Sequence, residues 1–154
     1  MALEIERKFL VDGEYKSHAI KQYSIKQGYL SLNSMTIVRV RTKDNKAYLT
    51  IKSAAIDEFT RHEWEYEIPY SDALEMLEQC TGSIIHKTRT LVQVNDHIFE
   101  VDEFYGDNEG LVVAEIELQS EDESFQKPEW LGKEVTSDPR YFNAYLAEHP
   151  FVTW

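Results

Sequence analysis

Residues 3–10 read Leu3-Glu4-Ile5-Glu6-Arg7-Lys8-Phe9-Leu10, an alternation of apolar and charged side chains that decides the fold. Successive side chains on a strand point to opposite faces, so Glu4, Glu6 and Lys8 share one face. Neighbours on that face lie about 7 Å apart, where like charges repel by roughly 2 kcal/mol at an effective dielectric of about 20. Water tolerates such a row cheaply, whereas an enclosed site requires counter-ions.

Like-charged pairs recur at the same two-residue spacing further along the chain. Cations occupy positions 39 and 41 and positions 87 and 89, and carboxylates occupy positions 115 and 117. For any one strand, the solvated face of an antiparallel sheet explains the pattern. Several strands whose cations and carboxylates are kept apart indicate a divided site, one part for anions and another for metal cations. The same rows also include Arg61, Glu67 and Glu100, to which we assign no function.

Length and charge set the class of protein. The 154 residues suit a single domain over 1–154, and a net charge of -12, from 28 acidic and 16 basic residues, argues against binding nucleic acid or anionic membranes. Acidic Glu4 and Glu6 interrupt the N-terminal apolar stretch, so no secretory signal is expected, and no apolar run is long enough for a membrane span. The single Cys80 excludes an intramolecular disulfide and fits a reducing cytoplasm.

Alternation and turn residues predict mostly strands. Asp44-Asn45 and Asn95-Asp96 have the composition of two-residue hairpin loops. Helices are predicted over 72–80, in a short segment opened by the capping-box pattern Ser120–Glu123, and from Pro139 to the C-terminus. The predicted strands cover 2–12, 22–32, 36–43, 46–53, 60–69, 84–94, 97–105 and 111–119.

Eight strands with short connections favour a mainly β, α+β fold: a closed or nearly closed antiparallel β-barrel with a few short flanking helices. The faces opposite the charged rows are apolar, as at Phe9, Val40 and Ile116. A charged lumen would leave this apolar face outside, where helices or a second subunit must cover it. The predicted helices are too short to cover it all, so we expect a homodimer.

The charged segments, taken in order, resemble the CYTH superfamily, the triphosphate tunnel metalloenzymes. Glu4-Ile5-Glu6-Arg7-Lys8 is similar to the Glu-x-Glu-x-Lys signature of that family. The resemblance covers essentially the whole chain and implies an eight-stranded antiparallel barrel that forms a tunnel with a charged interior. The later matching elements are Gln27–Leu30, Arg39–Arg41, Leu49–Lys52, Arg61–Glu65, Lys87–Arg89, Glu115–Glu117, Glu134–Thr136 and Arg140-Tyr141.

The resemblance also implies roles for individual residues. Glu63 and Glu65 would help to hold a second metal ion and the attacking water, and with Glu4, Glu6 and Lys8 they form the expected catalytic set. Carboxylates suit Mg²⁺ or Mn²⁺, of which two ions are expected. The expected metal ligands are Glu4, Glu6, Asp102, Glu115 and Glu117, and the expected phosphate ligands are Lys8, Lys26, Arg39, Arg41, Lys52, Lys87 and Arg89.

The expected activity is metal-dependent hydrolysis of the terminal phosphate of inorganic triphosphate. No segment of the sequence suggests a pocket for a base, which favours a bare polyphosphate. A class IV adenylate cyclase and a thiamine triphosphatase on the same fold remain alternatives, as does a non-catalytic module that binds polyphosphate or a nucleotide. Whether the C-terminal helix closes one end of the tunnel is left open.

Overall fold

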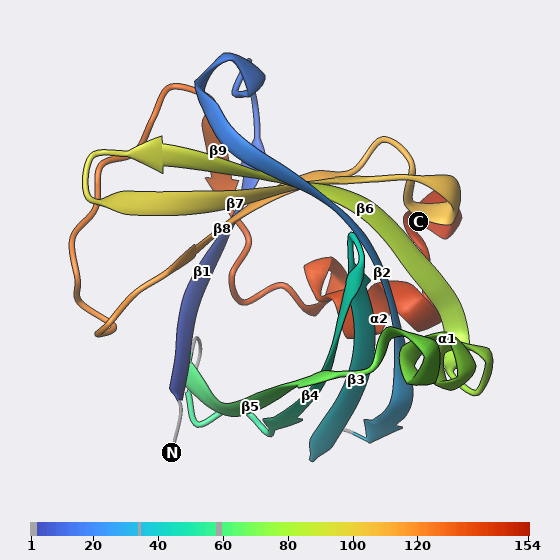
Figure 1. Cartoon of the computed structure of the whole chain (residues 1–154). Coiled ribbons are helices and arrows are strands. Elements are labelled where there is room, and N and C mark those ends of the chain that lie inside the picture. The colour runs from blue at the N-terminus through green and yellow to red at the C-terminus, as the bar shows by residue number, and fades with distance from the viewer. Residues whose placement is uncertain (1–2, 34, 58–59) are drawn as a thin grey trace.

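A computed structural model describes residues 3–33, 35–57 and 60–154 (Figure 1). Alternating segments become long antiparallel strands in the expected order, except that Ala2, the first residue of the expected strand 2–12, lies outside the described residues. The strands are β1 (Leu3–Val11), β2 (Ala19–Asn33), β3 (Thr36–Lys43), β4 (Lys46–Ser53), β5 (Thr60–Ile68), β6 (Thr81–Val94), β7 (His97–Phe104), β8 (Val112–Glu117) and β9 (Leu131–Glu134). The α-helices are α1 (Tyr70–Glu78) and α2 (Asn143–Glu148).

The sheet closes on itself. Its strand order is β5-β4-β3-β2-β6-β7-β8-β1-β9, and an additional pairing of β5 with β1 joins the ends of an eight-stranded barrel. β1 pairs with β5 at Leu3–Ile5 and with β8 at Glu6–Leu10. The ninth strand, β9, pairs with β1 at Phe9 and Val11 and was not predicted, because four residues are too few to show an alternation. The closed eight-stranded barrel itself is confirmed.

Both predicted hairpin loops are present. Asp44 and Asn95 adopt positive φ angles of 53° and 54°, the left-handed conformation that Asp and Asn accept more readily than most residues. These turns fix the register of β3 with β4 and of β6 with β7. In these two strand pairs, the residues that the alternation assigns to one face therefore share a face in the barrel.

The helices differ from their predicted bounds. α1 begins at Tyr70 rather than at residue 72, with Pro69 as its N-cap. The capping-box segment is a turn and not a helix, because the Glu123 carboxylate accepts a 2.6 Å hydrogen bond from the backbone N–H of Gln119 and contacts His97 at 2.5 Å. The C-terminal segment is divided, since Phe142 has an extended conformation between the 3₁₀ helix η3 (Pro139–Tyr141) and α2.

Much of the apolar exterior is covered by connecting segments. Phe125 and Trp130, in the stretch between β8 and β9, pack on Phe9 and Phe99 of the barrel wall. α1 covers the outer face of β3 and β4 through Ala73, which packs with Val40 and Ala47. Helices alone are indeed too short, but these segments supply much of the cover that the homodimer prediction assigned to a second subunit.

α2 lies inside one end of the barrel (Figure 1). Its buried residues Leu146 and Ala147 pack against the inner-wall residues Tyr29 and Ile85. A side chain at Gly82, whose φ is +75°, would meet the Ala147 carbonyl oxygen at 2.6 Å, so glycine permits this close contact. The C-terminal helix therefore fills one end of the interior. None of the described helices is long and apolar enough to cross a membrane.

Candidate functional site

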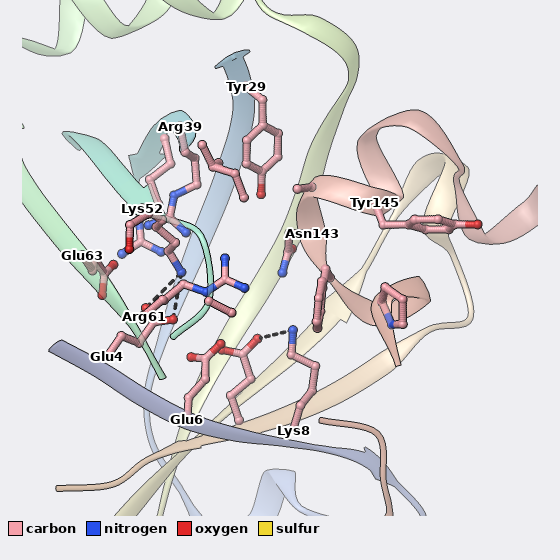
Figure 2. Close-up of a pocket in the computed structure, with 18 of the residues that line it drawn as sticks. Glu4, Glu6, Lys8, Tyr29, Arg39, Lys52, Arg61, Glu63, Asn143 and Tyr145 are labelled. Atoms are coloured by element: carbon pink, nitrogen blue, oxygen red, sulfur yellow. Dashed lines mark hydrogen bonds and ion pairs between the residues drawn. The ribbon is translucent and has the colours of Figure 1, made fainter. Parts of the chain in front are cut away.

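The inner faces of the strands and the C-terminal segment enclose a cavity of about 620 Å³ (Figure 2). Its lining is ionic, with seven cations and eight carboxylates. The predicted charged lumen is therefore confirmed. The cations are Lys8, Arg39, Arg41, Lys52, Arg61, Lys87 and Arg89; the carboxylates are Glu4, Glu6, Glu63, Glu65, Glu100, Glu115, Glu117 and Glu148.

The two arginines of β3 are braced by Glu65. Its Oε2 accepts hydrogen bonds from Arg39 (3.3 Å), Arg41 (3.2 Å) and the Thr50 hydroxyl (2.8 Å). Burial alone would raise the pKa of Glu65, but Arg41, Thr50 and Arg39 outweigh it and hold the pKa below its usual value. The predicted role of Glu65 in holding a metal ion and water is therefore not supported, because the carboxylate is already engaged in orienting the arginines.

Arg39 and Arg41 keep a further donor each. Their Nε atoms are buried and have no hydrogen-bond partner among the described residues. Buried polar groups in proteins are nearly always paired, and an unpaired donor costs about 1–3 kcal/mol. A planar guanidinium suits two oxygens of a phosphate at once. Both arginines line the cavity, so their guanidinium groups suit an oxyanion bound there.

Glu4, Lys52 and Glu63 form a charged chain across β1, β4 and β5. Lys52 Nζ donates to both Glu4 oxygens, at 2.9 and 3.1 Å (Figure 2). Burial would raise the pKa of Glu4, but Lys52 and a hydrogen bond with Glu63 lower it to about 2. Burial and the shared proton raise the pKa of Glu63 to about 7. Glu63 is therefore the more readily protonated carboxyl of this pair, and Glu4 is the ionised one.

One pair of carboxylates lies opposite each other on β1 and β8. Glu6 pairs in register with Glu117, and Lys8 pairs with Glu115. Lys8 Nζ lies 3.5 Å from Glu115 Oε1. Burial, Glu115 and Glu4 raise the pKa of Glu6 well above its usual value. The pKa of Glu115 is lowered, because Lys8 and Arg89 outweigh its burial. Opposed carboxylates of this kind destabilise a sheet unless a cation joins them.

The donor type of this row suits a divalent metal ion. Mg²⁺ and Mn²⁺ prefer carboxylate oxygens, and a cation between Glu6 and Glu117 would remove the repulsion. Within residues 3–33, 35–57 and 60–154, no three Asp, Glu, His or Cys side chains are already arranged to hold an ion. Glu4 would have to exchange its contact with Lys52 for such an ion.

Asp102 is enclosed by two cations of the cavity wall. Its carboxylate contacts Lys87 Nζ at 2.7 Å and Arg89 Nε at 2.8 Å, and it is 1% exposed. Arg89 donates to both Asp102 oxygens. Burial lowers the pKa of Lys87 to about 8. A metal-ligand role for Asp102 is not supported, because it is absent from the cavity lining and neutralises two cations.

Lys26 was wrongly predicted to face the lumen. It is exposed on β2, whereas its neighbours Ile25 and Gln27 are fully buried. The outward face of β2 also carries Gly28, where an added Cβ would lie 2.7 Å from the Cys80 sulfur beyond the end of α1. The parity of the strand therefore places Lys26 outside the cavity.

Several lining residues had no predicted role. Arg61 pairs in register with Glu4 and lies on the row of Glu63, so its position on the strand could have revealed it. Phe142 and Asn143 enter from the C-terminal segment, which has no alternation pattern. Lys87 Nζ donates to Asn143 Oδ1 at 3.0 Å, so α2 is tied to the cationic wall.

A family model of the CYTH domain matches residues 2–144. The chain belongs to the CYTH family. A CYTH protein of Acetivibrio thermocellus named inorganic triphosphatase is 48% identical over 98% of this chain and 97% of that protein. A second protein with this name, from Nitrosomonas europaea, is 39% identical over 94% of this chain and 96% of its own length.

Solved structures have the same architecture as this CYTH chain. The crystal structure of an inorganic triphosphatase aligns with a TM-score of 0.65 and 35% identity over 96% of this chain and 95% of that one. A Pyrococcus horikoshii protein aligns with a TM-score of 0.60 and 20% identity over 76% and 79% of the two chains. At that identity the second match speaks for the fold alone.

Proposed function

We propose that this CYTH protein is a divalent-metal-dependent triphosphatase that hydrolyses the terminal phosphate of inorganic triphosphate inside the barrel. The observation that carries the proposal is a cavity lined both by arginines and by the opposed carboxylates of Glu6 and Glu117. The names of the two curated relatives support the same reaction. A module that only binds polyphosphate would need the cations but not the carboxylate row.

The cations divide into those that bind the polyanion and those that support them. Arg39 and Arg41 line the cavity together with Lys52, Lys8 and Arg89, and these five cations are the proposed ligands of the polyanion. Lys87 is 1% exposed and is held by Asp102 and Asn143, so it acts mainly by adding positive charge to the inner wall beside Arg89. Glu65 keeps both arginines extended toward the cavity.

The carboxylates Glu4, Glu6, Glu115 and Glu117 are the proposed metal ligands, with Mg²⁺ or Mn²⁺ as the ion and two ions in the working enzyme. Such cations, when bound, neutralise charge on the phosphate oxygens. They also lower the pKa of a water, so that it can attack in line with the leaving group. Glu63, with a pKa of about 7, lies beside Glu4 and can exchange a proton near the attacking water.

The substrate assay separates the related activities. Phosphate, pyrophosphate and cyclic nucleotide release should be measured with inorganic triphosphate, ATP and thiamine triphosphate in the presence of Mg²⁺. We expect inorganic triphosphate to give phosphate and pyrophosphate at the highest kcat/KM. Formation of a cyclic nucleotide from ATP would instead identify an adenylate cyclase. A higher kcat/KM for phosphate release from thiamine triphosphate would identify a thiamine triphosphatase.

Two cations of neighbouring strands give a matched test of the phosphate site. Arg41→Ala should lower kcat/KM for inorganic triphosphate by about a hundredfold, because charge-assisted hydrogen bonds contribute about 1.5–3 kcal/mol each. Lys26→Ala should stay within about twofold of the wild type, because Lys26 is exposed outside the cavity. Equal losses for both variants would contradict the assignment of the lumen.

The homodimer and the cytoplasmic location stay predictions. Tyr66, Tyr70 and Leu74 are exposed on β5 and α1 and support a contact surface on this side. Sedimentation at micromolar concentration is expected to give a dimer, and a monomer would remove that prediction.

A further inference from the structure

Phe142 stands where the C-terminal segment enters the barrel. Its backbone is extended, with φ −74° and ψ 135°, between η3 and α2. The Phe142 N–H donates to the Pro139 carbonyl at 3.1 Å, and the Leu146 N–H donates to the Phe142 carbonyl at 3.0 Å. Leu146 is fully buried against the inner wall. The backbone of Phe142 is therefore held on both sides of the residue.

Two cations from different strands lie over the ring of Phe142. Lys8 Nζ of β1 lies over the ring, 5.2 Å from its centroid, and Arg61 Cζ of β5 lies 5.9 Å from the same centroid. Both distances fall within the range of attraction between a cation and an aromatic face. All three residues line the cavity. A single neutral side chain thus attracts two cations.

The remaining contacts of Lys8 explain why a ring is useful here. Its Nζ also donates to the Tyr141 carbonyl at 3.2 Å and lies 3.5 Å from Glu115. A further carboxylate would hold Lys8 more strongly, but it would repel a phosphate and would have to be displaced. An aromatic face attracts the ammonium group and carries no net charge. It can therefore hold the cations without competing with a polyanion.

We propose that Phe142 is a positioning residue that holds the Lys8 ammonium and the Arg61 guanidinium in place for the bound triphosphate. The inference rests on the proposed function and adds Arg61 to the substrate-binding cations. Loss of the ring frees two long side chains, which must then be ordered when the substrate binds. The penalty falls on binding, since the ring itself does not touch the reacting atoms.

The test compares Phe142→Leu with Phe142→Tyr. We expect Phe142→Leu to raise the KM for inorganic triphosphate about tenfold with kcat within about twofold, and Phe142→Tyr to restore KM to within about twofold of the wild type. Calorimetric titration with inorganic triphosphate in the presence of a chelator should show the same order of Kd values without metal. A KM for Phe142→Leu within twofold of the wild type would overturn the inference.

A control variant separates positioning from general loosening of the C-terminus. Phe151→Leu removes a half-buried ring that packs on Trp154 outside the cavity, and it should leave KM unchanged. The Lys8 ε-methylene protons should also show an upfield ring-current shift in NMR spectra that disappears in Phe142→Leu. An equal KM rise in Phe151→Leu, or absence of that shift, would contradict the inference; absence of turnover in the wild type would contradict the proposed function.

Discussion

Glu6→Gln is expected to lower the hydrolysis of inorganic triphosphate by at least about a hundredfold while making the metal-free protein more stable at neutral pH. The activity falls because a proposed metal ligand is lost. The stability rises because Glu6 is half-buried beside Glu115 and Glu4, so its ionised form is unfavourable in the fold. A gain of about 1 kcal/mol would raise the melting temperature by about 2–4 °C for a chain of this size.

The pH dependence of that gain has a definite sign. A carboxyl whose pKa is raised in the folded state removes stability as the pH rises above its ordinary value of 4.5. The advantage of Glu6→Gln should therefore be small at pH 4 and grow toward pH 7. Excess Mg²⁺ should stabilise the wild type more than the variant.

Glu67→Gln is the matched control for Glu6→Gln. Glu67 lies on the same strand as Glu63 and Glu65, but it is exposed and does not line the cavity. Melting curves and phosphate release should both match those of the wild type. A metal-free Glu6→Gln protein that melts below the wild type at pH 7 would show that the carboxylate supports the fold and is not held there against repulsion.

Asp102→Asn is expected to destabilise the protein severely, by about 3–5 kcal/mol. The change leaves Lys87, which is 1% exposed, and Arg89, which is 7% exposed, without their shared counter-ion. A loss of 3 kcal/mol corresponds to a fall in melting temperature of about 6–12 °C. Excess Mg²⁺ should not restore the wild-type melting temperature, because Asp102 neutralises Lys87 and Arg89 and is not a proposed metal ligand.

Glu100→Gln isolates the effect of burial on the same arginine. Glu100 Oε2 lies 3.2 Å from Arg89 Nη1, but the Glu100 side chain is 37% exposed. Partly exposed ion pairs contribute about 1 kcal/mol or less, so this variant should melt within a few degrees of the wild type. Equal melting temperatures for Asp102→Asn and Glu100→Gln would contradict the network described around Asp102.

The alternation of charged and apolar residues predicted the barrel strands and the residues that share a face, whereas the charged lumen was implied by the resemblance to the CYTH family. On regular strands such as β1, β3 and β8, side-chain parity alone determines which residues share a face, so Glu4, Arg39 and Glu117 could be assigned. Lys26 was misplaced because the lumen role was assigned to the charged residue of its segment. The side chains that point inward there, Ile25 and Gln27, carry no charge.

The parts that failed depend on contacts between distant segments. Asp102 has the parity of a lumen residue, but only the packed barrel reveals that Lys87 and Arg89 enclose it. The entry of Phe142 follows from the packing of Leu146 on a distant strand, about which local sequence carries no information. The short β9 forms because the edge of β1 beyond β5 is open to it.

The near balance of charge within the cavity leaves most of the net charge of -12 on the outer surface. An approaching polyanion is therefore repelled at long range and attracted only once it reaches the arginines. Salt shortens the range of repulsion to about 10 Å at 0.1 M and affects enclosed groups much less. The rate at which inorganic triphosphate associates should thus increase with added salt at low ionic strength, the reverse of the behaviour of a basic protein that captures nucleic acid.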